Sequence, residues 1–211
     1  MNETRPREKL PVVVLCAGGT PLTGALVHYL QVRGFAEIVL AGVPEGHPGW
    51  NSGGVHAVPE DGTAALGAAA RVVARRTPLI VWRGDTFFTG DPDWLVAFHV
   101  LRKAPVTLAL VRASRPGRFL IVETGEKGVV TALRDATPAA EAAWVYAGVA
   151  VCAPSFLDTL PAGETVSVER VLSRRVGSGL YGCRFPAARC FDLHRPEEAA
   201  RAAALLDTYP R

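Results

Sequence analysis

Short apolar runs separated by turn residues dominate the pattern of this chain. The run over residues 79–82, Leu-Ile-Val-Trp, has no polar alternation, which predicts a strand covered on both faces in a mostly parallel sheet. Residues 11–16 and 37–41 show the same pattern, and apolar side chains recur at helical spacing over residues 22–30. The order of strand, glycine turn, helix and strand predicts a βαβ unit at the start of the chain.

The remaining elements follow from the same reasoning. We expect a short strand at residues 55–58 and an alanine-rich helix over residues 63–76 before the apolar run at residues 79–82, which we call the central run. After it, we expect strands over residues 106–111, 119–123, 129–133, 144–152, 180–184 and 190–193, a hairpin loop at residues 125–128, and helices over residues 92–103, 155–160, 166–176 and 196–209. This succession predicts an α/β fold: a single-domain, Rossmann-like, mostly parallel mixed sheet flanked by helices.

Length and composition limit the classes of protein that the chain fits. Its 211 residues suit one domain, placed at residues 10–209 after a flexible N-terminal segment of residues 1–9. The net charge of +3 is too small for a nucleic-acid-binding protein. No apolar run approaches the ~20 residues that span a bilayer, and the N-terminal segment lacks the apolar core of a signal peptide, so we expect a cytoplasmic protein without membrane contact. The four cysteines lack Cys-x-x-Cys spacing and predict buried thiols.

A glycine turn follows the first predicted strand. Residues 16–24 read Cys-Ala-Gly-Gly-Thr-Pro-Leu-Thr-Gly, and such a turn aims backbone N–H groups at an anion. The turn loosely resembles that of the short-chain dehydrogenases, so an NAD(P)-dependent oxidoreductase is one alternative. Residues 41–43, Ala-Gly-Val, offer no side chain to bind a ribose, and Tyr146 is followed four residues later by Ala150 rather than lysine.

Asp85 stands at the end of the central run. Gly84 lets the backbone turn there, and Asp85 then projects where open α/β sheets bind their ligands. One interpretation is a turn residue that hydrogen-bonds its own backbone. The other is a ligand for the Mg²⁺ of a nucleotide, which requires hard oxygen donors and one or two carboxylates.

Six segments, taken in order, resemble motifs of the sugar-1-phosphate nucleotidyltransferases, especially the compact hexose- and heptose-1-phosphate type. They are Leu-Cys-Ala-Gly-Gly at residues 15–19, Glu-Asp-Gly-Thr-Ala-Ala-Leu at 60–66, Arg-Gly-Asp-Thr-Phe-Phe at 83–88, Trp-Val-Tyr-Ala-Gly-Val at 144–149, Leu-Tyr-Gly-Cys-Arg-Phe at 180–185, and Phe-Asp-Leu at 191–193 followed by Arg-Pro-Glu-Glu-Ala at 195–199. The family counterparts are Leu-x-Ala-Gly-Gly, Glu-x-x-Gly-Thr-Ala, Asn-Gly-Asp, Asn-Ala-Gly, Tyr-Gly-Tyr-x-Phe and Asp-Ile-Gly-Thr-Pro-Glu-Asp. The resemblance runs over residues 12–205, nearly the whole chain.

The resemblance implies transfer of a nucleoside monophosphate from a nucleoside triphosphate to a sugar 1-phosphate, with release of pyrophosphate. Mg²⁺ is the implied cofactor, held by Asp85 and Asp192, and Arg83 is a further candidate catalytic residue. The implied nucleotide-binding residues are Ala17, Gly18, Gly19, Thr20, Glu60, Gly62 and Thr63. The implied substrate-binding residues are Gly84, Tyr146 and Gly148, and Arg134 is a further candidate to bind the substrate.

The chain departs from the family where the family has cations. Residues 20–23, Thr-Pro-Leu-Thr, lead straight into the predicted helix, as though the phosphate-binding loop of the family had been shortened. No Arg or Lys stands between Lys9 and Arg33. Residues 135–138, Asp-Ala-Thr-Pro, replace the lysine-containing Glu-Lys-Pro, and Tyr146 replaces the asparagine of Asn-Ala-Gly. Arg83, Arg118 and Arg134 are the candidates to replace the lost cations, and His194 is a candidate to contact a metal-bound ligand.

These departures keep a second hypothesis open. It is a catalytically degenerate homologue that binds a nucleotide or sugar phosphate and acts as a regulatory or partner subunit. A metal-dependent glycosyltransferase of related architecture is a variant of the first hypothesis. A second copy of the chain and a partner enzyme are the macromolecular partners left open.

Overall fold

The computed structural model describes residues 10–16, 22–43, 54–59, 66, 77–137, 140–160 and 167–209. The predicted segment of residues 1–9 lies outside this part, as does the predicted helix over residues 63–76 apart from Leu66. In chain order the elements are β1 (Val12–Leu15), α1 (Thr23–Val32), β2 (Ile38–Ala41), β3 (Val55–Val58), β4 (Leu79–Arg83), β5 (Thr86–Phe88), α3 (Pro92–Arg102), β6 (Val106–Ala113), β7 (Leu120–Thr124), η1 (Glu126–Gly128), β8 (Val130–Asp135), β9 (Ala143–Cys152), α4 (Pro154–Leu157), α5 (Val168–Ser173), β10 (Leu180–Phe185), β11 (Cys190–Asp192) and α6 (Pro196–Leu206).

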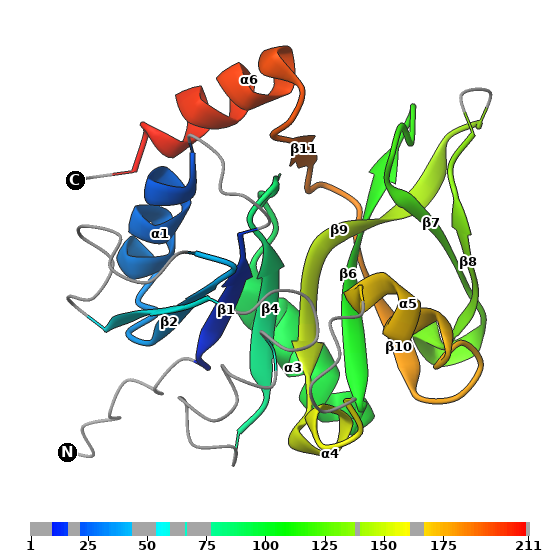
Figure 1. Ribbon diagram of the computed structural model, residues 1–211. Coiled ribbons are helices and arrows are strands. Elements are labelled where there is room, and N and C mark those ends of the chain that lie inside the picture. The colour runs from blue at the N-terminus through cyan, green and yellow to red at the C-terminus, as the bar shows by residue number, and fades with distance from the viewer. Residues whose placement is uncertain are drawn as a thin grey trace, which may run out of the picture.

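One mixed sheet forms the centre of the molecule (Figure 1). Its main path is β10-β6-β9-β4-β1-β2-β3, with β7 paired to β9 and to β8. The pairs β1–β2, β1–β4, β2–β3 and β10–β6 are parallel, whereas β9 runs antiparallel to both β4 and β6. The predicted mostly parallel mixed sheet is confirmed, and the predicted hairpin loop joins β7 to β8.

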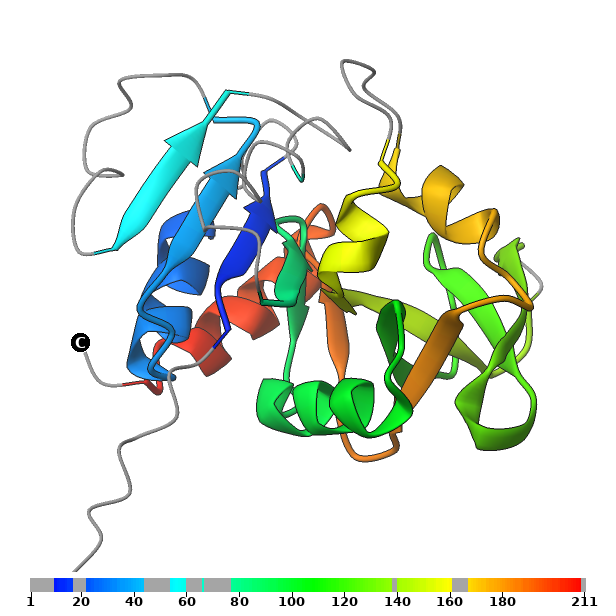
Figure 2. The ribbon, with the colours of Figure 1, turned by 90° about the horizontal axis from the view of Figure 1, so that it is seen from below.

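Helices cover both faces of this sheet (Figure 2). Ile80 and Trp82 of β4 belong to the core that includes side chains of α1, α3 and α6, while Leu79 and Val81 belong to the core beneath α4 and α5. Since all four side chains are buried, the run without alternation is a strand covered on both faces, as predicted.

A two-stranded sheet that the sequence pattern did not predict lies beside the main sheet. β5 follows β4 after a two-residue turn and pairs antiparallel with β11, with Thr86 opposite Asp192. This small sheet brings the strand predicted at residues 190–193 against the end of β4. It therefore decides the geometry of the candidate site.

Three of the four cysteines, Cys16, Cys152 and Cys183, are buried thiols, whereas Cys190 is partly exposed. The burial predicted for the cysteines is thus confirmed for three of them. Among the helices in the described residues, none is both long and apolar enough to span a membrane.

Candidate active site

The site lies where β1 and β4 end at the same edge of the sheet. Leu15 is in register with Arg83, and the Gly84 N–H donates to the Leu15 carbonyl at 2.8 Å. A Cβ atom at Gly84 would lie 2.9 Å from that carbonyl oxygen, so a larger residue would force the two strand ends apart. Gly84 is therefore needed for close backbone approach, and this approach places Asp85 beside the end of β1.

The pairing of β5 with β11 brings Asp192 to Asp85. The N–H of Leu193, directly after β11, donates to the Asp85 carbonyl at 2.9 Å. The Asp192 side chain is almost completely buried, and the N–H of His194 donates to its Oδ1 at 3.0 Å. The two aspartates that the sequence predicts as metal ligands are therefore neighbours, although they lie far apart in the chain.

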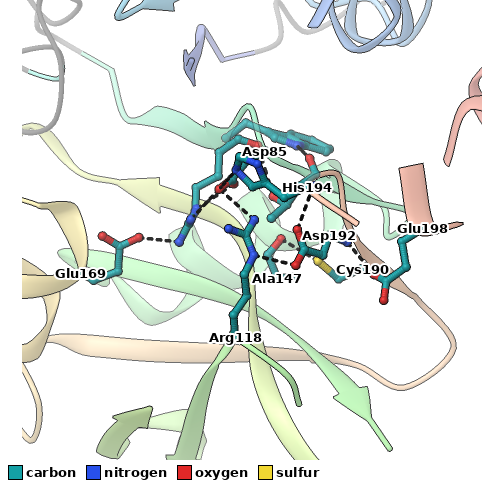
Figure 3. A network of polar contacts seen from close by, with 11 residues as sticks. Asp85, Arg118, Ala147, Glu169, Cys190, Asp192, His194 and Glu198 are labelled. Atoms are coloured by element: carbon teal, nitrogen blue, oxygen red, sulfur yellow. Dashed lines mark hydrogen bonds and ion pairs between the residues drawn. The ribbon is translucent and has the colours of Figure 1, made fainter. Parts of the chain in front are cut away.

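Arg118 bridges the two carboxylates (Figure 3). Its Nη2 lies 3.0 Å from Asp85 Oδ2, and its Nε lies 2.7 Å from Asp192 Oδ2. The residue comes from the segment between β6 and β7, and its side chain is 40% exposed, against 5% for that of Asp192. Of the three arginines proposed from the sequence, Arg118 is thus the one that pairs with both aspartates.

Arg83 holds Asp85 from a second direction. Its Nε donates to Oδ1 at 3.0 Å and its Nη2 donates to Oδ2 at 2.7 Å, which is the two-point geometry that suits a carboxylate. The remaining amine, Nη1, donates to Glu169 Oε1 of α5 at 2.8 Å. Because both ends of the guanidinium are engaged, Arg83 orients the Asp85 carboxylate and ties β4 to α5.

These contacts fix the charges of Asp85 and Arg83. Burial alone would raise the pKa of Asp85, but the hydrogen bonds and positive charge of Arg83, and then those of Arg118, hold this pKa below its ordinary value. Burial opposes the charge on Arg83 as well, yet Asp85 and Glu169 raise the pKa of its guanidinium. Asp85 is therefore ionised and Arg83 protonated around neutral pH.

Two glutamates that were not predicted from the sequence complete the network of polar contacts. Glu169 lies in the first turn of α5 and anchors Arg83. Glu198 lies in the first turn of α6, and its Oε2 accepts from the Asp192 N–H at 2.7 Å. Glu198 falls within a motif resembling the family, but Glu169 has no spacing relationship to either aspartate that could have revealed it. The Nε2 of His194 lies 3.5 Å from Asp85 Oδ2, and its contact with a metal-bound ligand stays a prediction.

The other predicted residues divide into described and undescribed ones. Gly148 has a φ of 78°, and a Cβ there would collide with Thr86 Oγ1 of β5. Tyr146 is buried, and this burial raises the pKa of its hydroxyl. Arg134 pairs with Glu123 at 3.1 Å on the β7–β8 hairpin rather than with either aspartate. Their roles toward a substrate stay predictions. The predicted nucleotide-binding residues Ala17, Gly18, Gly19, Thr20, Glu60, Gly62 and Thr63 lie outside the described part of the chain.

The arrangement of the two aspartates fits a divalent cation. Both carboxylates already reach one cationic group, the guanidinium of Arg118. Within the described residues, no group of three or more His, Cys, Asp or Glu side chains could hold a metal by itself. Two carboxylates are nevertheless a usual protein contribution to a Mg²⁺ site, where substrate phosphates and waters supply the other ligands.

Comparison with known proteins agrees with the motifs. No model of a known protein family matches the chain. A mannose-1-phosphate guanylyltransferase from Mycobacterium tuberculosis (strain ATCC 25618 / H37Rv) is 33% identical over 134 residues, which cover 62% of this chain and 37% of that protein. HddC from Yersinia pseudotuberculosis superposes with a TM-score of 0.75 at 15% identity, over 96% of this chain and 100% of that chain. A putative glucose-1-phosphate thymidylyltransferase from Bacillus anthracis gives a TM-score of 0.74 at 15% identity, over 96% and 97% of the two chains.

The chain resembles the sugar-1-phosphate nucleotidyltransferases in sequence and in fold. The resemblance predicted from the motifs and the predicted fold class are both confirmed. The structures establish the fold alone at this level of identity, and the match spans little more than a third of the length of the M. tuberculosis protein.

Proposed function

We propose that the protein is a Mg²⁺-dependent nucleotidyltransferase that transfers a nucleoside monophosphate from a nucleoside triphosphate to a sugar 1-phosphate. In this reaction a phosphate oxygen of the sugar attacks the α-phosphorus, the bond from that phosphorus to the bridging oxygen breaks, and pyrophosphate leaves. The observation that carries the proposal is the convergence of Asp85 and Asp192 on one cation at the carboxyl edge of β4, in a fold shared with enzymes of this class.

Asp85 and Asp192 would hold the Mg²⁺, which when bound supplies positive charge against the phosphates. Arg83 keeps Asp85 in one orientation because it binds both carboxylate oxygens and is itself held by Glu169. The Asp192 side chain is fixed by the N–H of His194, and its backbone is fixed by Glu198. The protein thus supplies a rigid pair of carboxylates, and positioning is what this class of reaction mainly requires of the protein.

Arg118 is the cation best placed to replace those that the shortened phosphate-binding loop lacks. Its guanidinium already lies at the two carboxylates, and its partial exposure leaves it open to a phosphate. Arginine suits this role, because its planar guanidinium can donate two hydrogen bonds to one phosphate.

Guanosine triphosphate is the first donor to test. The M. tuberculosis relative is named a guanylyltransferase. HddC has been crystallised in a complex with GMP-PN, and 93% of this chain superposes on that structure with a TM-score of 0.75 at 15% identity. Thymidine triphosphate is the second, because the B. anthracis neighbour is named a putative thymidylyltransferase.

A thermal-shift experiment tests the proposal. The protein is heated with each nucleoside triphosphate or NADP⁺, with and without Mg²⁺. A ligand at 100 times its dissociation constant adds about 2.7 kcal/mol, which raises the melting temperature by several degrees at this size. We expect one triphosphate to stabilise the protein only with Mg²⁺, and Asp85→Asn to abolish the effect. Asp158→Asn, at an exposed position of the turn after α4 at the other end of the sheet (Figure 1), should leave it intact.

The stabilising triphosphate is then incubated with sugar 1-phosphates, and pyrophosphate release is measured. Asp85→Asn should lower this rate by at least about 100-fold, since it removes a charge that stabilises the transition state. Stabilisation by NADP⁺ alone, or binding of a triphosphate that is indifferent to Mg²⁺ and to Asp85→Asn, would contradict the proposal.

A further inference from the structure

We infer that Arg118 is a built-in competitor of the divalent metal, so that the metal binds tightly only together with the triphosphate. The inference rests on the proposed function, because it assigns Asp85 and Asp192 to a metal. Arg118 would occupy both carboxylates in the empty enzyme and leave them for the phosphates of the incoming nucleotide. Nothing in the motifs that resemble the family carries this role, since Arg118 lies between two of them in the sequence.

The contacts of Arg118 differ from those of Arg83 in the way that a displaceable group requires. Arg83 binds a single carboxylate of the pair, that of Asp85, and is anchored at its far end by Glu169. Arg118 spans both carboxylates, at 3.0 Å and 2.7 Å, and no further ion pair holds it among the described residues. A cation bound by both aspartates would therefore displace Arg118, while Arg83 could keep its place.

Displacement by a metal alone is unfavourable for Arg118. Its guanidinium would lose a charge-assisted hydrogen bond to Asp85 and an ion pair with Asp192 and gain only water, which weakens the apparent metal affinity by the free energy of those two contacts. A triphosphate that arrives with the metal offers new oxygen partners to the same guanidinium. The lost bonds are then replaced, and metal and triphosphate strengthen each other's binding to the same extent, as linkage requires.

The burial of Asp192 explains why a cation is needed when no nucleotide is bound. Its side chain is only 5% exposed, so an unpaired charge there would be poorly hydrated. Arg118 supplies the missing charge without a metal. Removing Arg118 should therefore have two opposite effects: the empty protein becomes less stable, and the vacated carboxylates take up a divalent ion more readily.

The test measures binding of Mn²⁺ alone to the full chain, followed through the electron paramagnetic resonance signal of the free ion. Arg118→Ala should bind Mn²⁺ about tenfold more tightly than the unchanged protein, within the 5- to 150-fold range of typical couplings. Arg118→Lys, which keeps one charge but not the fork of donors, should fall between them. The control is Arg201→Ala, which removes an exposed cation from α6 and should leave the affinity unchanged.

Thermal unfolding of the same proteins gives the second measurement. Arg118→Ala should melt at a lower temperature without metal, and Mn²⁺ should restore more of its stability than it adds to the unchanged protein. Circular dichroism at a temperature well below melting verifies that the variant is folded, and Arg118→Lys serves if the alanine variant is not.

The outcomes separate this inference from the proposed function. The inference is supported if Arg118→Ala binds Mn²⁺ more tightly but releases pyrophosphate more slowly. A merely structural role of Arg118 would instead make the substitution weaken Mn²⁺ binding as well as turnover. Equal or weaker Mn²⁺ binding by the folded variant overturns it. If the unchanged protein still releases pyrophosphate in a reaction that requires Mg²⁺ and Asp85, only the role of Arg118 has failed. If it shows neither metal binding nor turnover, the proposed function has failed as well.

Discussion

Gly148 is the residue on which the approach of β5 to β9 depends. It has a φ of 78°, a conformation that costs other residues about 1–2 kcal/mol. A Cβ at this position would also collide with the side chain of Thr86, which is buried opposite Asp192 in the β5–β11 pair. The glycine is therefore explained by packing beneath the site, whatever it contributes to a substrate.

Gly148→Ala and Gly177→Ala separate backbone strain from this collision. Gly177 has a nearly identical φ of 77°, but a Cβ there would meet no atom within 4 Å. We expect Gly177→Ala to lower the free energy of unfolding by about 1 kcal/mol. Gly148→Ala should cost about 2 kcal/mol more, because Thr86 must also move. Urea denaturation measures both, and equal losses would show that Thr86 yields freely.

Single residues also show what the sequence could predict. Asp85 and Asp192 could be singled out because each stands in a motif with a recognisable order along the chain. Arg118 could be proposed only as one of three arginines, and Glu169 could not be proposed at all. Ion pairs between loops and helices distant in sequence follow no period, so the choice among exposed charges is decided by three-dimensional folding.

At the scale of elements, the packing of α3 on β6 contains a buried histidine. His99 of α3 is 3% exposed, and its Nδ1 shares a hydrogen bond with Thr107 Oγ1 of β6 at 3.0 Å. Burial lowers the pKa of the imidazole to about 4. The folded protein therefore keeps this side chain neutral at pH values where the unfolded chain, with a pKa of about 6.5, binds a proton.

This difference predicts how stability changes with pH. Above about pH 6.5 neither state is protonated, and between about 6.5 and 4 only the unfolded state gains the proton. Stability should fall by about 3 kcal/mol across this window as the pH decreases. His99→Gln should remove most of that slope in urea denaturation from pH 7 to pH 4. His56→Gln, at an exposed position of β3, should retain it, and an unchanged slope in His99→Gln would contradict the assignment.

Elements with many buried apolar residues were the predictable ones. β4 was predicted because both of its faces are covered, which leaves a run without alternation. β5 was not predicted, since it has only three residues and begins directly after the turn at Gly84 and Asp85. Its partner β11 lies about 100 residues later in the chain, and no local pattern records such a pairing.

At the scale of the whole molecule, the site forms only when the last part of the chain docks on the central sheet. Phe191 of β11 stacks on Phe87 of β5, with ring centroids 6.2 Å apart and an interplanar angle of 23°. Phe87 in turn packs edge-on against Tyr29 of α1. This aromatic contact positions Asp192, the next residue after Phe191, against Asp85.

Phe191→Leu and Phe185→Leu test this dependence as a matched pair. Phe185 of β10 is buried to a similar degree, 8% exposed against 7%, and packs edge-on against Phe88 at 5.1 Å, but it adjoins neither aspartate. Each substitution should lower the free energy of unfolding by roughly 1–2 kcal/mol, because each removes part of a buried ring. Only Phe191→Leu should also weaken Mn²⁺ binding in the presence of the triphosphate, because a small displacement of Asp192 separates the two carboxylates. Equal metal affinities in the two variants would mean that the hydrogen bonds of Leu193 and Glu198 hold β11 in place without the ring.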